Sequence, residues 1–96
     1  MSTYLVLWNW TEQGIRNLKD SPKRVDAFKQ LAEKNGGKVV QFFYTMGTYD
    51  GAAVVEAPSD EAFLKIVLGL GSLGNVRTTT LKAWTASDAA KVFSQV

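Results

Sequence analysis

The sequence predicts an α+β fold of the ferredoxin-like, split βαββαβ type, with two helices on one face of a four-stranded antiparallel sheet. Strand-like and helix-like segments alternate in the order βαββαβ and are followed by a short terminal helix. Turn-forming residues at 47–50 separate the second and third strand-like segments, and those at 74–77 precede the fourth. In this topology the first and third strands lie at the centre of the sheet. The 96 residues suffice for one hydrophobic core, so we expect a single domain over 1–96.

The first half of the chain contains one strand and one long helix. Residues 4–10 are rich in aromatic and branched side chains, which is typical of a strand. The polar stretch 11–20 reads as a loop that holds a helical turn. Pro22 suits the first position of the following helix, where no N–H is needed. Ser21, directly before it, is therefore expected to cap that helix with its side chain. The paired glycines at 36–37 end this helix.

The second half begins with two strands, over 39–46 and 52–57, that a tight turn joins. Gly47 is expected to adopt a positive φ in this turn, because it has no Cβ to clash with the backbone. Asp50 is expected to accept hydrogen bonds from nearby backbone N–H groups, as aspartates in turns do. Pro58 closes the third strand, since it cannot donate to a strand ladder.

A second helix, a fourth strand and a short helix complete the chain. Ser59 is expected to cap the second helix, whose apolar positions recur at helical spacing. The glycine-rich stretch 69–74 superficially resembles a phosphate loop, but it follows a helix instead of opening one, so we interpret it as helix-ending glycines. Residues 76–84 form the fourth strand, and the last helix begins near Thr85 or Ser87.

The first and third strands are apolar on both faces, although the two helices can cover only one face of the sheet. Antiparallel sheets face water only on a polar side. The most economical cover is the same face of a second copy, which predicts a homodimer or higher homo-oligomer. The alternative is that the terminal helix folds back over the open side. We assign Leu5, Leu7, Val55 and Leu81 to the helix side, and Val6, Trp8, Val54 and Thr80 to the partner side.

Composition excludes several classes of function. The chain has no cysteine and no histidine, which removes disulfides, zinc–cysteine sites, histidine-based triads and the usual haem ligand. We therefore expect no metal and no cofactor. The net charge of +2 is too small and too scattered for a nucleic-acid partner. No stretch approaches the ~20 apolar residues that cross a membrane, and no signal peptide is evident, so a cytoplasmic location without membrane attachment is expected.

Five short segments carry a resemblance that covers essentially the whole chain: NWTEQG (9–14), DSPKR (20–24), GGK (36–38), TMGTYD (45–50) and GNVRTTT (74–80). With these segments the chain resembles the GYD-domain family of the dimeric α/β-barrel group. Its second half is also similar to the ligand-binding domain of the feast/famine (leucine-responsive) regulators, which bind small effectors at subunit interfaces. The chain departs from those regulators because it lacks a helix-turn-helix segment. The resemblance implies a fold and a dimeric barrel, and no general reaction.

The topology gathers polar and aromatic residues at one end of the sheet. The end of the first strand meets the beginnings of the third and fourth strands, because its neighbours run antiparallel to it. Arg77 could hold a ligand carboxylate in bidentate fashion; alternatively it pairs with Asp50. Arg24 is expected to pair with Glu12, Asp20 or a partner protomer. The predicted ligand-binding residues are Asn9, Trp10, Thr11, Tyr49, Asp50 and Arg77.

Two functions stay open at this point. The first is an oligomeric small-molecule-binding domain for a small polar or carboxylate ligand. The second is a cofactor-free enzyme, monooxygenase- or isomerase-like, that acts on a small aromatic or lactone-like substrate. A closed apolar cavity beside the sheet, with Asp50 or Asn9 in its wall, would favour the enzyme, whereas a polar interfacial site would favour the binding domain. The residues that could line such a cavity are Trp8, Trp10, Phe42, Phe43 and Tyr44.

Overall fold

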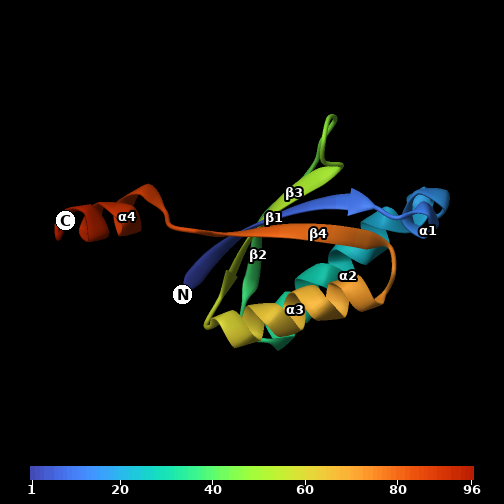
Figure 1. Cartoon of the computed structure of the whole chain (residues 1–96). Helices are drawn as coiled ribbons and strands as arrows, with labels where there is room; N and C mark the ends of the chain where they lie inside the picture. Colours follow the sequence, from blue (N-terminus) through green and yellow to red (C-terminus); the bar gives the residue numbers. More distant parts are fainter.

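The computed structural model describes residues 1–96 and has four strands and four α-helices around a single sheet (Figure 1). The sheet order is β2-β3-β1-β4, and every neighbouring pair is antiparallel, so the predicted ferredoxin-like fold is confirmed. The elements are β1 (Ser2–Trp10), α1 (Glu12–Arg16), a 3₁₀ turn (Leu18–Asp20), α2 (Ser21–Lys34), β2 (Lys38–Tyr44), β3 (Gly51–Ala57), α3 (Asp60–Ser72), β4 (Val76–Ala83) and α4 (Ala86–Phe93).

The central position of β1 and β3 is also confirmed. The last residues of β1 lie beside the first residues of both neighbours: Trp8 pairs with Gly51 of β3, and Asn9 pairs with Arg77 of β4. The chain thus brings residues that are about 40 and about 70 positions apart in sequence to one edge of the sheet, as the antiparallel order requires.

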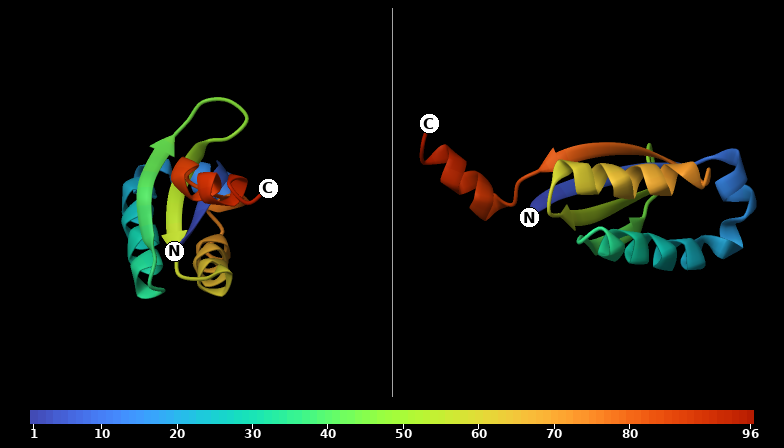
Figure 2. Two further views of the ribbon diagram at one scale, coloured as in Figure 1. Left: turned by 90° about the vertical axis from the view of Figure 1, so that its left-hand side faces the viewer. Right: turned by 90° about the horizontal axis from the view of Figure 1, so that it is seen from below.

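Helices α2 and α3 cover one face of the sheet, and both views in Figure 2 show them on that side. The core lies between them and β1 and β3. Tyr4 stacks on Phe63 with ring centroids 3.9 Å apart, which fastens β1 to α3. The buried members of this core are Tyr4, Val6, Phe28, Ala32, Ala53, Val55, Ala57, Phe63 and Ile66.

The predicted assignment of the two sheet faces is wrong for most residues. Val6 and Trp8 are only 1% and 4% exposed and lie on the helix side, together with Thr80, which pairs with Val6. Leu5 and Leu7 lie on the opposite side, because successive strand residues point to opposite faces. Leu81 pairs with Leu5 and shares that side. Of the assigned residues, only Val55 (helix side) and Val54 (opposite side) were placed correctly.

We call the side of the sheet opposite α2 and α3 the open face. Its centre is apolar, since Leu5 pairs with Val54 on one side and with Leu81 on the other. Phe43, on the neighbouring edge strand, is 52% exposed, and Leu81 is 49% exposed. No element of this chain packs over these residues in the views of Figure 2. The open face therefore leaves a contiguous apolar surface without cover.

Helix starts follow two different patterns. Ser59 and Thr85 cap α3 and α4, since their hydroxyls accept hydrogen bonds from the N–H groups of Ala62 and Asp88, 3.1 Å away in both cases. Ser21 does not cap α2 as predicted. It is already helical and buried, and its hydroxyl lies 2.8 Å from the hydroxyl of Tyr44. Its role is to link α2 to β2.

Helix α4 lies beyond the end of the sheet, where the chain leaves β4, and does not cover the open face (Figures 1 and 2). None of its residues is buried. The alternative in which the terminal helix folds back over the sheet is therefore wrong for this structure. No helix is long and apolar enough to cross a membrane.

The turn between β2 and β3 supports a direct stability prediction. Gly47 has φ of 127°, as expected, and a Cβ built there meets no atom within 4 Å. Gly47→Val should therefore lower the free energy of unfolding by about 1–3 kcal/mol through backbone strain alone. Urea titration followed by circular dichroism measures this. Gly71→Ala is the matched control, because Gly71 is helical and equally open; an equal effect of both substitutions would show that the turn conformation carries no strain.

Candidate functional site

Asn9, Asp50 and Arg77 meet where β1 ends and where β3 and β4 begin; we call this group the turn edge. The carboxylate of Asp50 accepts a hydrogen bond from the backbone N–H of Trp10 at 3.0 Å, and the N–H of Asp50 donates to the carbonyl of Trp8 at 2.9 Å. The side-chain amide of Asn9 donates to the carbonyl of Thr48 at 2.9 Å. These bonds tie the tip of the β2–β3 hairpin to β1.

Arg77 is the free cation of the turn edge. It is exposed, shares the open face with Asn9 and makes no hydrogen bond or ion pair. The chain has two ion pairs, Glu12–Arg16 and Asp60–Lys82, so the alternative in which Asp50 pairs with Arg77 is wrong. Since Asp50 is engaged with backbone, the guanidinium is available to a carboxylate from outside the protomer.

The other three predicted residues are placed differently. Trp10 is on the helix side of the sheet, since it follows the same alternation as Val6 and Trp8. Thr11 follows Trp10 in the sequence and links α1 to the loop before β4: its hydroxyl caps α1 and donates to the carbonyl of Gly74 at 2.6 Å. Tyr49 is half-buried in the hairpin, where its carbonyl accepts from the Thr45 hydroxyl. The predicted set is therefore split between the two sides of the sheet.

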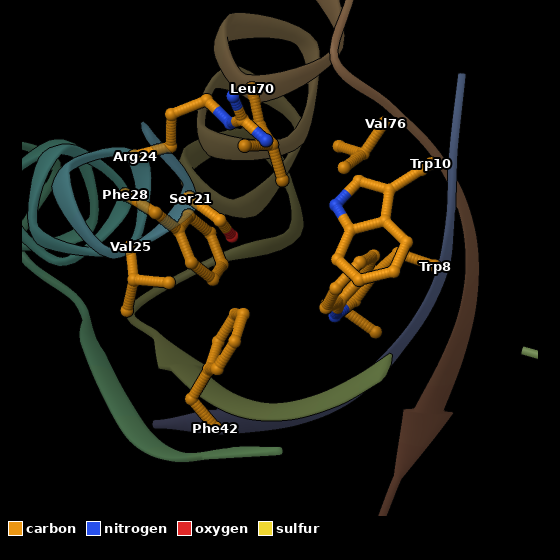
Figure 3. A pocket seen from close by; sticks show the side chains of 10 residues that line it. Trp8, Trp10, Ser21, Arg24, Val25, Phe28, Phe42, Leu70 and Val76 are labelled. Atoms are coloured by element: carbon orange, nitrogen blue, oxygen red, sulfur yellow. The ribbon is translucent and has the colours of Figure 1, made fainter. Parts of the chain in front are cut away.

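A second site, which we call the aromatic pocket, lies between the sheet and the helices (Figure 3). Trp8 forms its floor and contacts Trp10 edge-on, with centroids 5.3 Å apart, and Phe42 by stacking at 5.6 Å. Figure 3 shows Trp8 and Trp10 on one side of the opening, Arg24 and Phe28 of α2 on the other, and Phe42 below. The lining residues are Val6, Trp8, Trp10, Ser21, Arg24, Val25, Phe28, Phe42, Leu70 and Val76.

The polar groups of the aromatic pocket are mostly engaged. Arg24 donates to the carbonyls of Asn17 at 2.9 Å and Gly14 at 3.1 Å, so its predicted pairing with Glu12 or Asp20 is wrong, whereas the alternative of a partner protomer stays a prediction. The indole N–H of Trp8 is buried and has no hydrogen-bond partner. Sequence reasoning missed Ser21 and Arg24 as pocket residues. Their spacing in the sequence could have indicated this. Ser21 and Arg24 lie seven and four positions before Phe28, so all three residues share the core side of α2.

The size and chemistry of the aromatic pocket limit what it can do. Its cavity volume is about 40 Å³, which is room for roughly three water molecules. Neither Asp50 nor Asn9 lies in its wall, and Arg24 is its one ionisable side chain. It therefore lacks an acid or base for proton transfer. No cluster of three carboxylate side chains that could hold a metal ion occurs in the chain.

The groups with shifted pKa values lie far from both sites, at the opposite end of the sheet. Asp60, in the first turn of α3, accepts hydrogen bonds from the Tyr4 hydroxyl and from the Lys82 ammonium at 2.9 Å. These bonds, the one from Tyr4 above all, lower the pKa of Asp60. Burial and the bond to Asp60 raise the pKa of Tyr4, and the bond to Asp60 raises that of Lys82. The three groups anchor α3 to β1 and β4.

A pH dependence of stability follows from the lowered pKa of Asp60. A carboxyl whose pKa is lower in the folded than in the unfolded chain stabilises the fold above the unfolded value of about 3.9. This contribution is lost as the pH falls through the folded pKa. We expect Asp60→Asn to be less stable than wild type at pH 7 and to lose less stability on acidification below pH ~4. Urea midpoints measured at several pH values check this.

The matched control for that measurement is Asp26→Asn, which removes an exposed carboxylate of α2 that makes no hydrogen bond or ion pair. It should leave the stability at pH 7 within about 0.5 kcal/mol of wild type. If Asp60→Asn and Asp26→Asn lose equal stability between pH 7 and pH 3, the link of Asp60 to Tyr4 and Lys82 does not stabilise the fold.

The fold and the open face define a small ferredoxin-like domain whose sheet exposes an apolar side with a cationic edge. The chain belongs to the GYD domain family, whose sequence profile matches residues 4–93. Among curated proteins it is similar to the glutamine synthetase and cystathionine beta-lyase binding protein of Thermus thermophilus. The two are 35% identical over 89 residues, which cover 92% of this chain and 94% of the relative.

Solved structures give the same fold. A Thermus thermophilus protein is 28% identical, with a TM-score of 0.58 over 90% of this chain and 96% of that one. The feast or famine regulatory protein of M. tuberculosis, in complex with L-methionine, superposes with a TM-score of 0.68 at 15% identity. That match covers 90% of this chain and 52% of the regulator, so this chain spans about half of that protein's length. The predicted resemblance to both groups is confirmed at the level of family and fold.

Proposed function

We propose that the protein is a homo-oligomeric small-molecule-binding domain. Its protomers pack through the open faces and hold a small carboxylate-bearing ligand at the turn edge. The observation that carries this proposal is Arg77: an exposed guanidinium without an acidic partner, at the end of an apolar face that itself needs cover. When two open faces stack, the turn edge becomes part of an interface, where water is partly excluded and a charge-assisted hydrogen bond is strengthened.

The apolar open face supports the assembly. Leu5, Leu7 and Val54 are half-buried within the single chain, and Phe43 and Leu81 remain about half exposed. Large contiguous apolar patches are uncommon on monomeric proteins and mark interaction surfaces. A two-fold contact of this face with itself needs no second type of surface, because the same patch serves both protomers.

The geometry favours a binding domain over a cofactor-free enzyme. An enzyme would need a cavity that holds substrate beside an acid or base. The aromatic pocket offers about 40 Å³ and no carboxylate, whereas the turn edge offers an amide at Asn9 and a free guanidinium at Arg77. Such a pair can orient a ligand, and the one carboxylate of the turn edge, Asp50, accepts a hydrogen bond from the backbone N–H of Trp10 and lies outside the aromatic pocket.

Arg77 provides the test of the ligand site. Free L-amino acids, applied one at a time, are suitable probes because they carry a carboxylate on a small polar body. We expect at least one to raise the melting temperature of the wild type, and Arg77→Ala to weaken its binding by about ten- to a hundredfold. Arg16→Ala is the control, since Arg16 is exposed and pairs only with Glu12. Equal affinity of Arg77→Ala and wild type would exclude Arg77 from the site.

A second candidate function is docking to a larger metabolic enzyme, which the name of the 35% identical Thermus thermophilus relative suggests. Exposed Leu64 and Leu68 support it, because they lie one turn apart on α3 and form an apolar stripe. Calorimetric titration with glutamine synthetase and with cystathionine beta-lyase from the same host tests it. Binding that Leu64→Glu abolishes would support this candidate, and absence of heat with both enzymes would contradict it.

A further inference from the structure

The C-terminal helix has no partner in its own chain. Helix α4 continues past the end of β4 and away from the sheet, as the right-hand view of Figure 2 shows, and it contributes to a long axis of 49 Å against 30 and 17 Å in the other directions. Trp84, just before it, is 60% exposed, and Phe93, in its last turn, is 70% exposed. Helix α4 thus has a large exposed aromatic side chain just before its start and another at its end.

Helix α4 is amphipathic, with polar and apolar side chains on opposite sides. At 100° per residue, the polar residues Ser87, Asp88 and Lys91 fall on one side of the helix. The apolar residues fall on the other side, where they form one continuous stripe. This pattern is typical of a helix that buries one face against another surface. The stripe consists of Ala86, Ala89, Ala90, Val92 and Phe93.

The area of the open face indicates what that surface is. Four strands ~4.8 Å apart and about seven residues long span roughly 440 Å², so two stacked open faces would bury roughly 900 Å² in total. A stable protein–protein interface buries about 1,200–2,000 Å². This flat footprint omits the relief of the side chains, so the sheet faces alone reach about the lower end of that range.

The C-terminal segment can add to the area that two open faces bury. At their exposed fractions of 60% and 70%, and with ~150–250 Å² for each buried aromatic side chain, Trp84 and Phe93 could add roughly 300 Å² per protomer. Two such segments would raise the total to roughly 1,500 Å², within the range of stable dimers. Because every chain brings one open face and one C-terminal segment, a second copy supplies both surfaces in equal number.

We propose that α4, with Trp84, is an exchanged arm: it packs with its apolar stripe on the second copy of this chain and completes the interface that the open faces begin. This inference rests on the homodimer of the proposed function and adds a surface that the sheet does not contain. It assigns a function to the exposed aromatic residues Trp84 and Phe93, and it makes α4 a determinant of dimer affinity.

The test compares two substitutions at the same end of α4. Phe93→Asp places a charge in the apolar stripe, and Ser94→Asp places the same charge on the polar side one residue later. Sedimentation velocity of the full chain over a concentration series gives the dimer dissociation constant. We expect Phe93→Asp to raise it at least tenfold, and Ser94→Asp to leave it within threefold of wild type. A dissociation constant unchanged by Phe93→Asp overturns the arm, while a wild-type dimer still supports stacking of the sheet faces.

Two further outcomes distinguish an exchanged arm from a helix that packs on its own chain. A monomeric wild type at the highest concentration would overturn both the arm and the proposed assembly. In the background of Leu5→Asp, which we expect to be monomeric, Phe93→Asp should leave the melting temperature unchanged. A drop there would show that α4 packs on its own chain, and it would overturn the exchange between copies.

Discussion

Val6→Asp is expected to unfold the protein, whereas Leu5→Asp, one residue earlier, is expected to leave it folded and to separate the protomers. Val6 is 1% exposed beneath α2 and α3. An unpaired carboxylate there would cost more than about 4 kcal/mol, which is a large part of the ~5–15 kcal/mol that stabilises a typical domain. Leu5 lies on the open face between Val54 and Leu81, where a charge is hydrated in the monomer but buried in the stacked dimer.

For Leu5→Asp the expected loss of dimer affinity is at least a hundredfold, which corresponds to about 2.7 kcal/mol. Circular dichroism reports the fold, and light scattering coupled to size exclusion reports the mass. If Val6→Asp folds with the stability of wild type, the two faces are assigned the wrong way round. If both variants fold and stay dimeric, the open face is not the interface.

Gly51→Ala is the second change with a large expected effect. Gly51 pairs with Trp8 on the helix side, and a Cβ built there would lie 1.9 Å from Cζ2 of the Trp8 ring and 2.6 Å from the carbonyl oxygen of Phe43. The indole cannot move without breaking its contacts with Phe42 and Trp10, and the carbonyl belongs to the backbone of β2. Overpacking of this kind costs about 3 kcal/mol or more.

A thermal melt checks the expected destabilisation, with Thr48→Ala as the control. Thr48 is exposed in the same hairpin and contributes only its carbonyl to a hydrogen bond. Its substitution should change the stability by no more than about 0.5 kcal/mol. Fluorescence of the buried indole provides a second readout. A Gly51→Ala variant that melts with wild type and keeps its emission would show that the Trp8 ring does not lie over β3 as described.

The order of the elements could be predicted because local signals agreed with one another. Local signals marked the element boundaries: the turn residues at 47–50, the proline at 58 and the capping serine at 59. Each predicted boundary lies within one or two residues of the one in the structure. The βαββαβ order then determines which strands are central, and with them which residues share an edge. For that reason the neighbourhood of Asn9 and Arg77 followed from topology alone.

The sheet faces could not be predicted from β1, because both of its alternating sets are apolar and period-two patterning cannot rank them. Strand pairing decides the matter. The large residues Trp8 and Val6 of β1 pair with the small residues Gly51 and Ala53 of β3, and the Trp8 ring lies over Gly51. These small residues therefore lie on the helix side of the sheet, together with Trp8 and Val6. The predicted placement of Leu5 beside Val55 contradicts this pairing, in which Leu5 lies opposite Val54.

The candidate site divides for a similar reason. Topology places Trp10 and Asp50 at one edge, but it does not reveal that the carboxylate is used by the N–H of Trp10 while the indole turns to the helix side. The side on which the indole lies follows from alternation once the faces of β1 are known, whereas the hydrogen bond to Asp50 joins residues 40 positions apart and has no local signal. Arg77 makes no ion pair, and Asp50, the acidic group of the same edge, is engaged with the backbone.

Native mass spectrometry of protein purified from its own host tests the proposed ligand-bearing dimer, since it reports assembly and ligand in one spectrum. We expect a species of two 10.5-kDa chains that carries the additional mass of a small molecule, and we expect Arg77→Ala to keep the dimer and lose that mass. A single unliganded chain of 10.5 kDa at micromolar concentration would contradict it.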